Sequence, residues 1–214
     1  MGPDIDEIVV ADEPGTWRAA GFDVGEGHCD IGTVRVVLAG RDAGRGIIGW
    51  SMRGLDGDVD FDGLRPSRSD APPRTPAPPQ PNSVTAIDHL VAFTPDRDRT
   101  VAAIEATGLS VRRVRDEPSP GGAGGQAFFR LGEVILEVIE YAPDSPRVTD
   151  RDAPARLWGL ALAVDSMERS AEVLGENLGT PRDAVQPGRR IATLRRSAGL
   201  AIPIAFMTPG PRAA

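Results

Sequence analysis

The stretch Ile87-Asp88-His89-Leu90-Val91-Ala92-Phe93 decides the fold. It is a mostly apolar run of the length of one buried strand. Residues 97–107 follow with a helical pattern of small and apolar residues, and Gly108 stands where a glycine commonly ends a helix. Three more strand patterns come next, at 109–115, 126–131 and 133–141. The order strand, helix and three strands predicts a βαβββ unit.

The same order recurs on both sides of this unit. Toward the C-terminus, residues 157–164 predict a strand, and Asp165 or Ser166 can cap a helix over 167–178. Three strand patterns then follow, at 183–185, 190–195 and 200–207. Toward the N-terminus, residues 5–11 predict a strand and 17–20 a short helix, and three strand patterns follow at 22–24, 28–38 and 46–52. Repeated βαβββ modules predict an α+β fold whose curved mixed sheet encloses a cleft.

A proline-rich stretch divides the chain. Seven of the sixteen residues from Pro66 to Pro81 are proline, and such a sequence favours extended, semi-rigid backbone. We therefore expect an N-terminal βαβββ-like module over 1–64, a linker over 65–83 and a paired βαβββ domain over 84–210. Because a lone module would leave half a core exposed, we expect the first one to pair with a second chain, as a homodimer, or to dock on the C-terminal pair.

Composition excludes several classes of function. The formal net charge is −7 and the chain contains no lysine, which argues against nucleic-acid binding, Schiff-base chemistry and a Walker phosphate loop. A single cysteine, Cys29, permits no intrachain disulfide. No apolar run is long enough to span a membrane, and the acidic N-terminus is unlike a secretory signal. We expect a cytoplasmic protein with a small-molecule ligand and neither nucleic-acid nor membrane partners.

The motifs around His89 resemble a known family. The opening 87–91, the later Gly132-Glu133-Val134-Ile135-Leu136-Glu137-Val138 and the stretches 159–164 and 184–189 are similar to the vicinal-oxygen-chelate (VOC) superfamily, which includes glyoxalase and bleomycin-resistance proteins. The resemblance covers about residues 84–208, and more weakly 5–55. It implies a cleft in which a histidine of the first strand and a glutamate of the fourth strand hold a divalent metal.

Carried over residue by residue, this site consists of His89 and Glu137. The third module departs from the pattern, because Gly159 stands at the ligand position of its first strand and 202–207 contains no carboxylate. The resemblance therefore implies a divalent metal with an incomplete ligand set, or no cofactor. His89 is interpreted as a ligand or a general base, with a packed, hydrogen-bonded histidine as the alternative, and Glu137 as the glutamate that faces the cavity.

Three further residues are candidates for substrate binding. Gln186 and Arg189 flank a tight turn, where an arginine could hold a carboxylate or phosphate; a solvent-facing turn is the alternative. Trp158 is expected in the cavity wall. We therefore expect acid/base proton transfer on a small oxygenated molecule, of the isomerase, epimerase or lyase type, with His89 and Glu137 as the catalytic residues. The alternative is a non-catalytic, bleomycin-resistance-like protein that binds a drug or metabolite.

Overall fold

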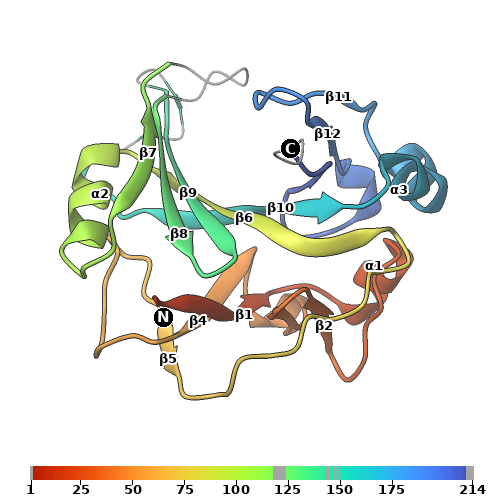
Figure 1. Ribbon diagram of the computed structural model, residues 1–214, viewed down its shortest axis with the longest axis horizontal. Helices are drawn as coiled ribbons and strands as arrows, with labels where there is room; N and C mark the ends of the chain where they lie inside the picture. The colour runs from red at the N-terminus through yellow and green to blue at the C-terminus, as the bar shows by residue number, and fades with distance from the viewer. Residues whose placement is uncertain (1, 118–123, 143–144, 147, 149, 211–214) are drawn as a thin grey trace.

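The computed structural model describes residues 2–117, 124–142, 145–146, 148 and 150–210. These residues form one sheet of eight strands and one of five, with few and short helices, so the predicted α+β class is confirmed. Figure 1 shows the two sheets stacked, with α2 (Arg97–Glu105) and α3 (Met167–Leu174) at opposite ends of the larger one. Among the described residues, no helix has the length and apolar character that crossing a membrane requires.

The larger sheet is made of two βαβββ units. The middle unit comprises β6 (Val84–Thr94), α2, β7 (Val111–Arg115), β8 (Gln126–Leu131) and β9 (Val134–Glu140). The C-terminal unit comprises β10 (Arg156–Val164), α3, β11 (Arg182–Asp183), β12 (Arg190–Thr193) and β13 (Ile204–Met207). Ser166 is the cap of α3, since its side chain accepts a hydrogen bond from the Arg169 backbone N–H. The helix pattern over 167–178 ends early, because Leu174 is followed by a 3₁₀ turn, Gly175–Asn177.

Both units follow one strand order. In each, the first strand lies parallel to the last, and the remaining strands add outward, which gives the order β11-β12-β13-β10-β6-β9-β8-β7. The units join through their first strands, because β10 pairs antiparallel with β6. In Figure 1, β7, β8 and β9 rise on one side of β6 and β10, and β11 and β12 on the other. The predicted repetition of βαβββ modules is thus confirmed for this half of the chain.

The N-terminal module departs from this order. It contains β1 (Asp4–Val10), α1 (Pro14–Ala19), β2 (His28–Ile31), β3 (Val34–Leu38), β4 (Ile47–Arg53) and β5 (Ser67–Ser69), in the sheet order β2-β3-β1-β4-β5. The interpretation of 28–38 as one strand was wrong, and 46–52 is not the last strand of a βαβββ unit. Gly32, with φ of 58°, turns 28–38 into a hairpin, so β3 becomes the parallel neighbour of β1.

The strand β4 lies on the other side of β1 and runs antiparallel to it. This is the relation that β10 has to β6, so β4 occupies the position of a second unit's first strand. The predicted strand at 22–24 is also absent, because Phe22 and Val24 are buried in a loop and serve the core.

The two sheets share one hydrophobic core. Leu90 of β6 is paired with Leu136 and Leu160 on its two sides, and all three are buried on the sheet face opposite to His89. The same cluster of buried residues contains Ile8 of β1 and other residues of the N-terminal module. The apolar face of that module therefore packs on the C-terminal pair, one of the two arrangements that we expected, and it covers the larger sheet from the side away from the cleft.

The proline-rich segment is ordered against the N-terminal module. Its strand β5 pairs in parallel with β4, and the Arg74 side chain forms ion pairs with Asp6 and Glu7. Gln80 and Asn82 near its end are buried and hydrogen-bonded to backbone groups of the module. Segment 65–83, predicted as a linker, thus contributes a strand and buried polar contacts.

Candidate active site

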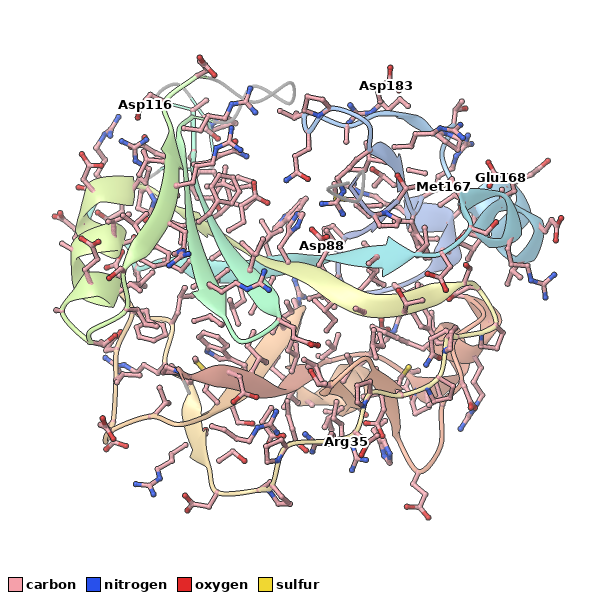
Figure 2. The ribbon with its side chains drawn as sticks, in the orientation of Figure 1. Arg35, Asp88, Asp116, Met167, Glu168 and Asp183 are labelled. Carbon is pink, nitrogen blue, oxygen red and sulfur yellow. The ribbon has the colours of Figure 1, made fainter. Side chains whose placement is uncertain are left out.

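A β-bulge turns two neighbouring side chains toward the same face of β6. His89 pairs with Ala161 of β10, but the next pair joins Ile87 to Leu162, so Asp88 is an extra residue in β6. Such a bulge locally cancels the alternation of side chains along a strand. As a result Asp88 lies beside His89 on the cleft face, and Figure 2 shows Asp88 in the centre, between the two raised parts of the sheet.

His89 lies between two carboxylates. Its Nδ1 is 2.8 Å from an Asp88 oxygen, and its Nε2 is 3.1 Å from an oxygen of Glu137 on the neighbouring strand β9. The other Glu137 oxygen accepts a hydrogen bond of 2.6 Å from the Gln126 side-chain amide. All of these side chains are largely buried. The imidazole is therefore fixed at both nitrogens, and Glu137 is oriented by two partners.

These contacts set the charge of the site. Burial alone would lower the pKa of His89, but its hydrogen bonds to Asp88 and Glu137, together with their charges, outweigh burial and raise the pKa to about 9. Burial would raise the pKa of Asp88, but hydrogen bonds and charges from His89 and Arg189 lower it to about 2. At neutral pH His89 is an imidazolium cation facing a carboxylate.

The two shifts act on stability at opposite ends of the pH scale. The raised pKa of His89 stabilises the folded state fully below the ordinary value of 6.5, and this contribution is lost as the pH rises through about 9. The lowered pKa of Asp88 stabilises the folded state above 3.8, and this contribution is lost as the pH falls through about 2. Both contributions are therefore fully present between pH 3.8 and pH 6.5.

Gln186 and Arg189, both predicted from the turn, contact each other, and Arg189 also reaches Asp88. The Arg189 guanidinium donates to Asp88 at 2.6 Å, to the Gln186 side chain at 2.6 Å and to the Thr208 backbone oxygen at 2.7 Å. All three guanidinium nitrogens of Arg189 are thus engaged in contacts within the protein. The turn after β11 is thereby tied to β6, and Arg189 acts on His89 through Asp88.

A small cavity opens over His89 and Glu137. It measures about 230 Å³, and Gln186 lies in its wall together with Arg113 and Arg115 of β7. Arg113 has no hydrogen bond or ion pair to another side chain among the described residues, whereas Arg115 contacts the exposed Glu117 at 3.3 Å. The wall opposite to Glu137 is uncharged and mostly apolar: Ala184, Val185, Gln186, Pro187, Ile191 and Met207. The cavity thus suits a small molecule that carries negative charge at the β7 side.

Trp158 lies apart from this cavity. Its ring packs edge-on against Phe93 at a centroid distance of 5.2 Å and is 40% exposed in a different, larger cavity. The structure therefore brings together four of the five residues predicted for the site, and Trp158 is the one that it does not.

Asp88 and Gln126 are the residues that sequence reasoning missed. A signal for Asp88 was present, because Ile5-Asp6-Glu7 of β1 matches Ile87-Asp88-His89 of β6 and carries the same bulge, with Asp6 as the extra residue. Gln126 had no such signal, since its contact with Glu137 depends on the pairing of β8 with β9.

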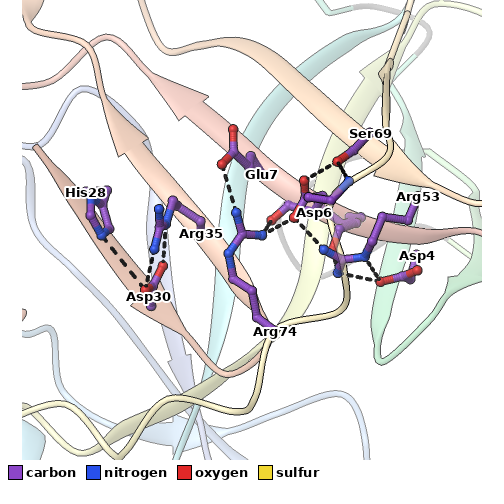
Figure 3. A network of polar contacts seen from close by, with 11 residues as sticks. Asp4, Asp6, Glu7, His28, Asp30, Arg35, Arg53, Ser69 and Arg74 are labelled. Atoms are coloured by element: carbon purple, nitrogen blue, oxygen red, sulfur yellow. Dashed lines mark hydrogen bonds and ion pairs between the residues drawn. The ribbon is translucent and has the colours of Figure 1, made fainter.

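The N-terminal module holds a counterpart of the site that is filled by arginines. Asp6 of the bulge forms ion pairs with Arg53 and Arg74, and Arg74 also reaches Glu7, the residue in the place of His89, at 2.9 Å (Figure 3). Val37 lies opposite Val9 as Glu137 lies opposite Val91, so the position matching Glu137 is apolar. This half of the chain keeps the bulge and the aspartate–arginine contact, and side chains of the protein fill the space over them.

Close packing explains the missing half-site of the C-terminal unit. A Cβ atom on Gly159 would lie 2.4 Å from the backbone oxygen of Pro203, much closer than van der Waals contact permits. The position where the family ligand would stand can therefore hold only glycine unless the backbone moves.

Replacing Gly159 by Ala is accordingly expected to lower the free energy of unfolding by about 1–3 kcal/mol, because the added methyl group forces β10 and β13 apart. Urea unfolding followed by tryptophan fluorescence measures the change. Gly15→Ala is the matched control, since nothing lies within 4 Å of its added Cβ and it should leave stability unchanged or slightly raised. Equal stability of Gly159→Ala and the natural protein would contradict this packing argument.

The described residues contain no group of three or more His, Cys, Asp or Glu side chains placed to hold a metal ion. His89 and Glu137 are a suitable first pair, and Asp88 would orient the histidine as outer carboxylates do in metal sites. The opposite cavity wall, however, supplies only apolar side chains and one amide. This donor set does not fit a tightly bound resident metal, which takes three or four protein ligands.

Comparisons with known proteins found likeness in structure only. No protein-family model matches the chain, and no curated protein matches it. Among solved structures, methylmalonyl-CoA epimerase from Mycobacterium tuberculosis is 15% identical, with a TM-score of 0.49 over 61% of this chain and 91% of that one. A Streptomyces coelicolor methylmalonyl-CoA epimerase variant in complex with 2-nitronate-propionyl-CoA is 22% identical, with a TM-score of 0.48 over 60% of this chain and 100% of that one. A hypothetical protein from Bacillus halodurans is 20% identical, with a TM-score of 0.48 over 60% of this chain and 96% of that one.

Proposed function

We propose that the chain is a VOC-type, glyoxalase-like protein that catalyses an isomerase-type proton transfer on a small, anionic, oxygenated molecule. The observation that carries this proposal is the contact of 3.1 Å between the His89 imidazole and the Glu137 carboxylate at the cavity floor. An acid and a base side by side, in a largely buried site, can act on adjacent atoms of one substrate.

In the proposed reaction Glu137 is the base and His89 the electrophile. A Glu137 oxygen takes the proton from a carbon next to a carbonyl group, and the C–H electron pair forms a C=C bond while the carbonyl oxygen becomes negative. Once Glu137 is protonated, the Nε2–H of His89 donates to this oxygen and stabilises its charge. When the substrate carries a C=C bond next to that carbon, Glu137 returns the proton to the far carbon of this bond. The oxygen gives its electron pair back to re-form C=O, and the C=C bond moves one position along the molecule, which leaves an isomer of the substrate.

The cavity wall favours a transfer on one face of the substrate. Inversion of a carbon centre needs a second acid or base on the opposite face, and no titratable side chain lies among Ala184, Val185, Gln186, Pro187, Ile191 and Met207. A single carboxylate suffices for a shift of the proton along the molecule. Arg113 and Arg115 are proposed to hold a carboxylate group of the substrate, while Arg189 positions Asp88 and, through it, His89.

Exchange of carbon-bound hydrogen tests the proposal without knowledge of the product. The natural protein is incubated in D₂O with carboxylates that bear a neighbouring carbonyl, namely 2-oxo and 3-oxo acids, and NMR follows each C–H signal. We expect one position of at least one compound to exchange far faster than in buffer, and the His89→Ala, Glu137→Ala double variant to lack this activity. The proposal would be overturned if the natural protein catalysed no exchange and bound the tested compounds no more tightly than the double variant does. That result would support the non-catalytic binder, which the apolar wall would also suit.

A metal measurement separates this proposal from a metal-dependent one. Because two donors are too few for tight binding, purified protein is expected to hold well below one equivalent of divalent metal by elemental analysis. Near one equivalent that disappears in the His89→Ala, Glu137→Ala variant would contradict the proposal and show that water, substrate or another chain completes the site.

We further propose that the partner is a small molecule rather than a nucleic acid, consistent with the net charge of −7. A homodimer through the N-terminal module remains a prediction, which the mass in solution by light scattering tests. The apolar face that would have required such a partner is already covered by the C-terminal pair.

A further inference from the structure

The larger cavity that contains Trp158 lies at the seam between the N-terminal module and the C-terminal unit. It measures about 850 Å³, and its two sides come from residues 41–46 after β3 and from residues 193–203 around β12. None of its lining residues belongs to the cavity over His89. It is therefore a separate groove, of the size that medium-sized organic ligands occupy.

Four arginines line this groove and no acidic residue does. They are Arg41 and Arg45 on the N-terminal side and Arg195 and Arg196 on the other. The chain as a whole carries 31 acidic against 24 basic residues, so an all-basic wall is not what its composition would give at random. Such a wall concentrates positive potential inside an acidic protein.

Most of these guanidinium groups have no partner among the residues that the structure describes. Arg41 donates to the Gly199 backbone oxygen at 2.5 Å and lies 3.6 Å from Asp12. Asp12 itself is fully buried and also accepts from the Trp17 ring N–H. The side chains of Arg45, Arg195 and Arg196, by contrast, have no hydrogen bond or ion pair within the part of the chain that the structure describes. Three cationic groups thus remain available to a ligand.

The groove also has an apolar side. Trp158 lines it together with Leu200 and Ile202, and contact with Phe93 holds the exposed indole in place. A large aromatic side chain left 40% exposed in a cavity offers a stacking surface to a flat ring. Arginines alone would suit any anion, whereas arginines facing an exposed indole suit an anion that carries a ring.

We propose that this groove binds a phosphate ester with a flat ring system, the chemistry of a nucleotide. The phosphates would lie among Arg45, Arg195 and Arg196, which can each donate two hydrogen bonds to one phosphate, and the ring would stack on Trp158. This site is independent of the proton transfer proposed for His89.

Calorimetric titration of the full chain with ADP tests the proposal, with adenosine and inorganic pyrophosphate as partial probes. We expect ADP to bind more tightly than either partial probe, because each of them makes only half of the contacts. The Arg195→Ala, Arg196→Ala double variant should bind ADP at least about tenfold more weakly, and Trp158→Leu about tenfold more weakly.

A matched control corrects for the loss of two charges. Arg112 of β7 and Arg182 of β11 are exposed, have no side-chain partner in the described part of the chain and do not line the groove. The Arg112→Ala, Arg182→Ala variant should keep the natural affinity for ADP. Equal weakening in both double variants, undiminished binding in Trp158→Leu, or no binding of ADP by the natural protein would each overturn the proposal.

Discussion

Replacing Glu137 by Gln is expected to lower the rate of proton exchange about 10²–10⁴-fold, the usual contribution of a positioned general base. Glutamine has the size of glutamate and keeps an oxygen that can accept the hydrogen bond from Gln126, so the cavity retains its shape. It cannot take a proton from carbon. The loss should therefore fall on turnover, with binding of the same compound largely kept, which titration calorimetry measures beside the exchange rate.

Glu140→Gln is the control for this experiment. Glu140 lies three residues further along β9, and the alternation of the strand places it on the other face of the sheet from Glu137. Its replacement removes the same charge from the same strand and should leave the exchange rate unchanged. Similar losses in both variants would mean that charge or fold, and not the base at position 137, explains the effect.

Replacing Arg53 by Met is expected to lower the free energy of unfolding by about 3–5 kcal/mol, the cost of breaking a buried ion pair by removing one partner. The Arg53 side chain is 7% exposed and donates to Asp4, Asp6 and the Ile5 backbone oxygen. Asp6, whose side chain is 4% exposed, would keep only Arg74 and Ser69 as partners (Figure 3). Urea unfolding followed by circular dichroism measures the loss.

Arg65→Met is the matched control for Arg53. The pair of Arg65 with Asp60 has a comparable distance, 2.7 Å, but both side chains are exposed, so its loss should cost less than about 1 kcal/mol. If Arg53→Met is as mild as Arg65→Met, the network in the N-terminal module does not stabilise the fold as its burial implies.

The βαβββ units were predictable because their signals are local. Each of the three first strands is an apolar run, and a helix pattern and a turn follow it at fixed spacing. The same reasoning failed in the N-terminal module, where a glycine at position 32 divides one apparent strand into a hairpin. Which strand then pairs with β1 depends on contacts between distant segments. The sequence pattern of 46–52 fits a strand on either side of β1 and so does not decide between the two positions.

The candidate site was predictable only in part, and for the same reason. His89 and Glu137 were accessible from the family pattern, and Gln186 and Arg189 from the turn. Trp158 was expected in the wall of the same cavity because it stands in an apolar context, but the edge contact with Phe93 directs it to the other groove. The role of Asp88 depends on a bulge, which no propensity reveals, although the repeated Ile-Asp pair at 5–6 and 87–88 was visible in the sequence.

The proposed mechanism depends on the charge of His89, because the electrophile exists only if this imidazole is protonated at neutral pH. The chain has two histidines, His28 and His89, so an NMR titration of the imidazole signals, with His28→Gln for assignment, can follow His89 directly. We expect a pKa of about 9 for His89 in the natural protein and a clearly lower value in Asp88→Asn, which removes one of the two carboxylate charges. A His89 that titrates near 6.5 and does not respond to Asp88→Asn would contradict the proposed mechanism.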